Sequence, residues 1–314
     1  MTSAPGKPAR IVSLLPSATE ILFAVGAGER VVAVTHECDH PAEAAALPKV
    51  TANALPTEGA SAASIDRHIR AALHEGSSIY ALDAALLHEL APQLIVTQEL
   101  CEVCAVSYRT VQQAVRSLPG HVPVLSLEPG SLDDIAATVL AVGSAAGCEP
   151  RAGQVVEAMR ERIGVVTAMA PPEPRPVMLC LEWTDPLMAG GHWVPEMVAL
   201  AGGVDPLGRR GVPSREVSWN EVLAAQPDVV VLMPCGFGLQ RTLSLARDVT
   251  ERPGFDQMPA AASGRVVAVD GSSYFNRPGP RIVTGLEILA AAVRATAGSP
   301  LPAGAAWALT PAAV

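Results

Sequence analysis

The sequence has few charged residues and no excess of positive charge. Charged residues make up 17% of the 314 residues, and 22 Lys and Arg stand against 31 Asp and Glu, which gives a formal net charge of −9. The longest run of basic residues is the pair Arg209-Arg210, so no basic segment is available to neutralise a phosphate backbone. We therefore expect no nucleic-acid partner.

Long apolar runs are also absent. A glycine, a proline or a charge interrupts every apolar stretch before it reaches the roughly 18 residues that a membrane-spanning helix needs. Residues 11–15, which follow Lys7 and Arg10, imitate a secretory signal, but Pro16 and Glu20 break its apolar core. We expect no membrane span and a cytoplasmic protein as the sequence is printed, or a periplasmic or surface protein if a leader has been removed.

The motifs of common enzyme classes are missing. Gly26 and Gly28 lack the third glycine of a dinucleotide-binding loop, and they follow a helical pattern instead of preceding one. The phosphate-binding G-x-x-x-x-G-K loop, the G-x-S-x-G nucleophile elbow and the H-E-x-x-H zinc motif do not occur. We therefore expect a binding protein and not an enzyme, with a thiol-dependent enzyme as the less favoured alternative.

What the sequence does have is an alternation of strand and helix patterns in two sets. Apolar residues make up 49% of the chain, enough for sizeable cores. Short β-branched runs predict buried strands at 10–15, 31–35, 94–97, 122–127, 176–181, 229–233 and 265–269. Apolar residues three and four positions apart predict helices at 19–25, 83–90, 106–118, 194–201, 219–225, 239–249 and 280–292. This alternation predicts the α/β class, with two lobes of mainly parallel sheet.

A long helical pattern separates the two sets. From Glu149 to Ala170 an apolar stripe lies opposite charged residues, with Pro150 at the helix start and Pro171-Pro172 at its end. A helix of about twenty residues is roughly 30 Å long, which predicts that one long rigid helix joins the lobes. The predicted organisation is a monomer with a disordered arm (1–8), an N-terminal lobe (9–130), a helical connector (131–170), a C-terminal lobe (171–298) and a tail (299–314).

Chemically distinctive residues gather just after the predicted strands. The ligand crevice of an open parallel sheet lies beyond the carboxyl ends of its strands, so these positions mark the candidate site. Aromatic residues are scarce, with 4 Trp, 3 Tyr and 4 Phe, and their presence in these loops favours a large flat or amphipathic ligand. The candidate ligand-binding residues are Ser13, His36, Gln98, Trp183, His192, Trp193, Phe237, Tyr274, Phe275 and Asn276.

The segment of His192 and Trp193 has two equal interpretations. Gly190 and Gly191 would let a ligand approach the backbone while the two rings supply stacking and a hydrogen-bond donor. The alternative is a plain turn whose aromatic ring covers the lobe. On the first interpretation, loss of the Trp193 ring weakens binding roughly tenfold and leaves folding intact, because a loop ring supports little core.

The cysteines raise the question of a metal. Cys101 and Cys104 form a single C-x-x-C motif, which suits half of a zinc site, a redox dithiol or a corner of an iron–sulfur site. Cys38 and His36 follow a neighbouring predicted strand, so these four residues can form a Cys3His set for zinc or another soft metal if they converge. The alternative is that the cysteines are small buried apolar residues, since a second C-x-x-C pair is absent.

Several blocks of the sequence together resemble a known family. They are residues 11–20, His36-Glu37-Cys38-Asp39, Ile95-Val96-Thr97-Gln98, the long central helix, and Asp270 with the segment 276–281. These blocks resemble the helical-backbone, or class III, substrate-binding proteins of ABC importers, and within them the vitamin B12-binding branch. The resemblance covers residues 9–295.

The resemblance implies a non-enzymatic protein with two α/β lobes, one long connecting helix and a ligand held between the lobes. It implies cobalamin or a related corrinoid as the ligand and an ABC importer permease as the partner. Permease docking in this family uses one acidic residue per lobe, for which Glu58 and Glu216 are candidates by position. A thiolate, His36 or His192 can coordinate cobalt from an axial side. The alternative function is a cytosolic metal-ion or metal-chelate binder that uses the cysteines.

Overall fold

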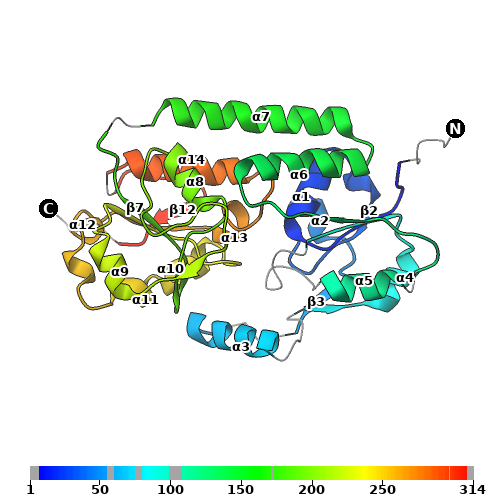
Figure 1. The fold of residues 1–314 in the computed structure, drawn as a ribbon, viewed down its shortest axis with the longest axis horizontal. Helices are drawn as coiled ribbons and strands as arrows, with labels where there is room; N and C mark the ends of the chain where they lie inside the picture. Colours follow the sequence, from blue (N-terminus) through cyan, green and yellow to red (C-terminus); the bar gives the residue numbers. More distant parts are fainter. Residues whose placement is uncertain are drawn as a thin grey trace. The chain divides into compact units, whose positions relative to one another are not determined.

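The computed structural model describes residues 7–54, 60–74, 80–98, 108–116, 118–170, 173–296 and 298–309 (Figure 1). The chain divides into two compact units. Unit 1 contains residues 1–129 and 133–158, and unit 2 contains residues 130–132 and 159–314. Each unit combines helices with a sheet that contains parallel strands, so the predicted α/β class is confirmed. Among the described residues, no helix has the length and apolar character needed to cross a bilayer.

Unit 1 is built on a parallel sheet of short, largely buried strands. Its order is β2-β1-β5-β6, and every neighbouring pair runs parallel. The strands are β1 (Ile11–Ser13), β2 (Val31–Ala33), β5 (Leu94–Thr97) and β6 (Val124–Ser126). β-Branched residues dominate them because such side chains pack well on a pleated, buried surface. Each strand lies within a run that the sequence predicts as a strand.

The other elements of unit 1 surround this sheet or form a small two-stranded sheet. The helices are α1 (Pro16–Ala24), η1 (Gly28–Arg30), α2 (Ala42–Ala45), α3 (Ala62–His74), α4 (Ala84–Leu90), α5 (Tyr108–Arg116) and α6 (Leu132–Ala145). Asp83 caps α4 by accepting the N–H of Leu86. The strands β3 (Thr51–Asn53) and β4 (Tyr80–Leu82) pair antiparallel and form a two-stranded sheet. The sequence patterns predict neither β3 nor β4.

One long helix, α7 (Glu149–Ala168), contributes to both units. Its residues up to Ala158 belong to unit 1, and those from Met159 belong to unit 2. In unit 1 it packs closely on α6, because a Cβ at Gly143 would lie 2.3 Å from the Cβ of Ala152. The predicted continuous helix over this region is confirmed.

Unit 2 contains a mixed six-stranded sheet of order β12-β11-β10-β7-β8-β9. The strands are β7 (Met178–Thr184), β8 (Leu187–Ala189), β9 (Arg215–Glu216), β10 (Val229–Leu232), β11 (Val266–Val269) and β12 (Ala305–Trp307). The three central strands β7, β10 and β11 run parallel, while β8, β9 and β12 add antiparallel edges. β12 lies in the segment that the sequence assigns to a tail, because its short run of Ala, Ala and Trp carries no strand pattern.

Helices complete the core of unit 2. They are α8 (Val194–Leu200), α9 (Trp219–Ala224), α10 (Leu239–Leu245), α11 (Arg247–Thr250), η2 (Phe255–Gln257), α12 (Pro259–Ala262), α13 (Gly271–Tyr274) and α14 (Ile282–Arg294). The single helix predicted over 239–249 is therefore two helices, α10 and α11. Buried residues of β7 and β10 pack with Val222, Phe255 and Met258 in one apolar cluster.

Candidate functional site

At the carboxyl edge of the unit 1 sheet, Ser13 is part of the core. Its hydroxyl donates to the carbonyl of Leu15 at 3.1 Å and accepts the hydroxyl of Thr19 at 2.8 Å. Ser13 is fully buried, so these bonds hold the turn from β1 into α1. Ser13 therefore has a structural role in this turn, and its ligand contact stays a prediction.

Cys38 also lies in the core beside this turn. Its Sγ is 3.1 Å from Thr19 Oγ1 and 3.1 Å from Thr35 Oγ1. Within the described ranges, no group of three or more His, Cys, Asp and Glu side chains is placed to hold a metal ion. Cys101 and Cys104 lie outside those ranges, so their convergence with Cys38 stays a prediction.

His36 follows β2 and is held by the two-stranded β3–β4 sheet. Its Nδ1 lies 2.7 Å from Thr51 Oγ1, and its ring centroid lies 5.3 Å from that of Tyr80. Burial lowers the pKa of His36, with Glu37 acting against this shift and Lys49 adding to it. The structure thus adds Thr51 and Tyr80 to the site, and no local sequence pattern marks either residue.

The end of β5 lies at the centre of the same edge. Gln98 directly follows this strand and is largely buried. The buried hydroxyl of Thr97, one residue earlier, has no hydrogen-bond partner among the described residues. Polar groups therefore reach the centre of the unit 1 edge, where the sequence places a ligand contact by Gln98.

In unit 2, Trp183 and Phe237 form an aromatic pair at the carboxyl edge. Leu181 pairs with the last residue of β10, so β7 continues past β10, and Trp183 in this extension pairs with Met188 of β8. The Trp183 and Phe237 ring centroids are 5.3 Å apart, and the guanidinium of Arg241 lies 5.4 Å from the Phe237 ring. All three side chains are partly exposed. We call Trp183, Phe237 and Arg241 the aromatic platform.

Trp193 and Phe275 are buried, in contrast to the sequence interpretation. Trp193 is 8% exposed, and its Nε1 donates to the carbonyl of Phe275 at 2.9 Å. The side chain of Phe275 is 0% exposed. These two rings belong to the packing between the start of α8 and the end of α13, so the view of Trp193 as a loop ring that supports little core is wrong.

Tyr274 and Asn276 flank Phe275 and are partly buried. The ring of Tyr274 lies against Gly304, whose φ of +87° and lack of a Cβ permit this contact, and 5.6 Å from the guanidinium of Arg281. The Oδ1 atom of Asn276 is buried without a hydrogen-bond partner among the described residues. Among the described residues, Asn276 thus carries a buried acceptor that is left unsatisfied.

The backbone of His192 is held in the left-handed region, with φ of 48°. Its N–H donates to the carbonyl of Val212 at 2.7 Å, and its carbonyl accepts the N–H of Gly211 at 2.8 Å. A Cβ at Gly191 would lie 2.3 Å from the backbone nitrogen of Ser214, so only glycine allows this close approach. Burial lowers the pKa of His192. The structure thus clamps the His192 turn against the segment that precedes β9.

Glu182 ties this clamp together, although the sequence analysis gives it no role. Its Oε1 accepts the N–H of Gly191 at 2.8 Å, and its Oε2 accepts the hydroxyl of Ser214. Burial raises the pKa of Glu182 to about 7, against the effect of these two hydrogen bonds. Burial also raises the pKa of nearby Asp205. An acidic residue inside an otherwise apolar strand is the sequence signal that marks Glu182.

The raised pKa of Glu182 predicts a pH-dependent stability. Between pH 4.5, the ordinary value, and about 7, the folded state binds more protons at this carboxyl group than the unfolded state. The free energy of unfolding therefore falls as the pH rises through this window, by up to about 3 kcal/mol for a shift of this size. Urea unfolding measured from pH 4.5 to 8 is expected to show a flatter decline for Glu182→Gln than for the wild type. The raised pKa of Asp205 leaves a remaining decline of the same sign in this variant.

Glu161→Gln on the exposed face of α7 is the matched control and is expected to keep the wild-type decline. A Glu182→Gln protein that loses stability with pH as steeply as the wild type would show that Glu182 is not the group responsible.

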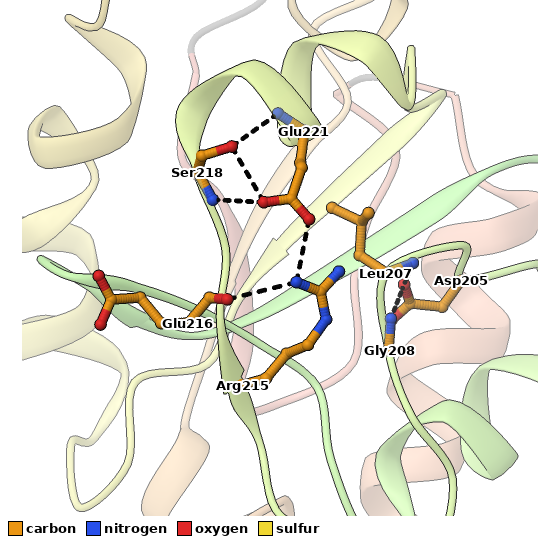
Figure 2. Close-up of polar contacts among 7 residues, drawn as sticks. All are labelled: Asp205, Leu207, Gly208, Arg215, Glu216, Ser218 and Glu221. Carbon is orange, nitrogen blue, oxygen red and sulfur yellow. Dashed lines mark hydrogen bonds and ion pairs between the residues drawn. The ribbon is translucent and has the colours of Figure 1, made fainter.

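The edge strand β9 is anchored by charged contacts at the start of α9 (Figure 2). Nη1 of Arg215 lies 3.0 Å from Oε1 of Glu221 and donates to the carbonyl of Glu216 at 3.3 Å. Ser218 and Glu221 form a reciprocal capping box, and the N–H of Ser218, followed by Arg215, lowers the pKa of Glu221 to about 2. The side chain of Glu216 points away from Arg215 in Figure 2 and is exposed.

Comparison with known proteins gives matches over most of the chain. The family described as periplasmic binding protein matches residues 11–272. A vitamin B12-binding protein of Vibrio cholerae is 26% identical over 288 residues, which cover 88% of this chain and 86% of that protein. An uncharacterised ABC transporter substrate-binding lipoprotein of Bacillus subtilis is 23% identical over 300 residues, which cover 91% of this chain and 80% of that protein.

A solved structure gives a similar result. The periplasmic heme-binding protein of Roseiflexus sp. RS-1, in its apo form, has a TM-score of 0.68 and 26% sequence identity. The alignment covers 90% of this chain and 97% of that chain. The matches therefore extend over both units and cover 80% to 97% of the length of each relative.

Proposed function

The chain belongs to the periplasmic binding protein family, and we propose that it binds cobalamin or a related corrinoid. The aromatic platform is the observation that carries this proposal. Trp183 and Phe237 offer two partly exposed rings at one edge, in a chain with only 4 Trp and 4 Phe. A flat macrocycle that covers such a ring gains about 1.5 to 3 kcal/mol for each ring removed from water.

Arg241 supports a ligand with polar groups at its rim. Its guanidinium lies beside the Phe237 ring, so a ligand resting on that ring brings its periphery within reach of the N–H donors. The carboxamide side chains of a corrin ring, and the phosphodiester of complete cobalamin, are acceptors of this kind. The platform therefore matches both the flat face and the polar rim of a corrinoid.

The name of the Vibrio cholerae relative favours a corrinoid, and that of the Roseiflexus relative favours heme. Both ligands are flat, metal-containing macrocycles that aromatic rings bind well. Mass spectrometry and visible absorption of the protein purified from its own host separate them. We expect a corrinoid mass and a corrinoid spectrum. A heme spectrum, or zinc without an organic ligand, would overturn the proposal in favour of a heme carrier or a cysteine-based metal binder.

We further propose an ABC importer permease as the partner, in line with the Bacillus subtilis relative. Of the two acidic candidates for docking, Glu58 lies outside the described residues, and Glu216 is exposed on β9. The Arg215–Glu221 contact and the capping box hold the backbone on either side of Glu216 (Figure 2). An exposed carboxylate on such a fixed strand suits pairing with a basic permease residue.

Glu216→Gln is expected to bind corrinoid like the wild type but to slow corrinoid uptake by a host strain that lacks the native copy. Glu251→Gln, an exposed change next to α11, is the control and should leave uptake unchanged. Uptake by the Glu216→Gln strain at the wild-type rate would remove Glu216 from the docking surface.

A further inference from the structure

The imidazole of His36 is held in one orientation by a buried hydroxyl group. Its Nδ1 lies 2.7 Å from Thr51 Oγ1, and the backbone N–H of His36 donates to the same oxygen at 3.1 Å. Thr51 is buried at the start of β3, so the β3–β4 sheet fixes the position of this oxygen. The backbone contact fixes His36 beside this oxygen, and the Nδ1 contact then holds the ring in one orientation.

The ring face of His36 is packed as well. Tyr80 on β4 lies with its ring centroid 5.3 Å away at an interplanar angle of 55°, and its hydroxyl donates to Glu37 Oε1 at 3.1 Å. Asn53 of β3 is paired in register with Tyr80, so the β3–β4 sheet carries both the orienting hydroxyl of Thr51 and the packing ring of Tyr80. The β3–β4 sheet thus supports the imidazole of His36 at the carboxyl edge of the four-stranded sheet of unit 1.

The Nε2 edge of the ring is the part that these contacts leave open. His36 is only partly buried, and no hydrogen bond joins Nε2 to another residue in the described part of the chain. Burial lowers the pKa of His36, which favours the neutral ring that a metal ligand requires. In the tautomer whose Nδ1–H donates to Thr51 Oγ1, the lone pair of the ring lies on Nε2.

A histidine with one nitrogen held by an oxygen and the other nitrogen open has the arrangement found at metal centres. We propose that Nε2 of His36 coordinates the cobalt of the bound corrinoid as an axial ligand. This inference rests on the proposed function and deepens it, because it favours corrinoids whose lower axial position is open, such as cobinamide. In the Co(III) form, Nε2 donates its electron pair to cobalt, one bound water leaves, and the oxidation state of cobalt does not change.

The test is electron paramagnetic resonance of the full chain loaded with Co(II) cobinamide. A coordinated histidine nitrogen splits each cobalt line further, and the splitting changes when the protein carries nitrogen-15 histidine. We expect this signature in the wild type. His36→Gly should lose it and regain it when free imidazole is added, while His121→Ala, at an exposed histidine before β6, should keep it.

Thr51→Val separates orientation from coordination. Valine keeps the shape of threonine but lacks the hydroxyl, and loss of such an orienting partner lowers metal affinity roughly 10- to 100-fold. We expect the Thr51→Val protein to bind cobinamide at least about tenfold more weakly than the wild type and to show a reduced nitrogen signature.

Equilibrium dialysis of the same samples distinguishes the possible failures. Cobinamide that binds without the nitrogen signature, or a signature that survives in His36→Gly without imidazole, overturns the axial ligand and leaves the proposed function standing. A protein that retains no corrinoid at all overturns both proposals.

Discussion

Replacing Trp193 with alanine is expected to lower the free energy of unfolding by about 3 to 5 kcal/mol. The ring is 8% exposed at the start of α8, and its Nε1 donates to the carbonyl of Phe275. The substitution therefore leaves a cavity and an unsatisfied buried carbonyl. Urea unfolding followed by circular dichroism measures the loss.

Two variants control for this result. Trp193→Phe keeps a ring but removes the donor, so it should cost less than Trp193→Ala. Trp183→Ala removes a partly exposed ring and should cost less still. If Trp193→Ala unfolds at the same urea concentration as the wild type, the ring does not support the core of unit 2.

Replacing Trp183 with alanine is expected to weaken corrinoid binding tenfold or more with little loss of stability. The ring lies on the part of β7 that extends past β10, beside Phe237, and covering it contributes about 1.5 to 3 kcal/mol. Each 1.4 kcal/mol lost corresponds to about a tenfold weaker Kd. Calorimetric titration with hydroxocobalamin measures the change, and Phe237→Ala should give a similar one.

Trp219→Ala is the matched control for this prediction. Trp219 begins α9, donates from Nε1 to the carbonyl of Pro253 and packs on the unit 2 core, so its loss should lower stability and leave affinity unchanged. Equal affinity of the Trp183→Ala protein and the wild type would place the ligand elsewhere.

The central strands of both sheets could be predicted from the sequence because burial selects their composition. Leu94–Thr97 and Val229–Leu232 are continuous buried runs rich in β-branched residues, which is the pattern of a strand covered on both faces. The two-stranded β3–β4 sheet could not be predicted in this way. Its strands are short, mostly exposed or half-exposed, and paired across a long stretch of chain, so no alternation of apolar residues marks them.

The site could be predicted only as far as strand ends define it. Trp183 lies near the end of β7 and Phe237 follows the neighbouring parallel strand β10, and the structure places their rings together. The same rule also selected Ser13 and Phe275, which face the core. Position after a strand fixes where the backbone lies, whereas the direction of a side chain depends on packing contacts with distant residues.

The most direct test of the account is a calorimetric titration of the full chain with hydroxocobalamin, cobinamide and hemin in parallel. We expect a corrinoid to bind with a Kd below about 1 μM, or about −8 kcal/mol, and more tightly than hemin. Absence of binding heat with either corrinoid at concentrations of tens of micromolar, or tighter binding of hemin than of both corrinoids, would contradict it.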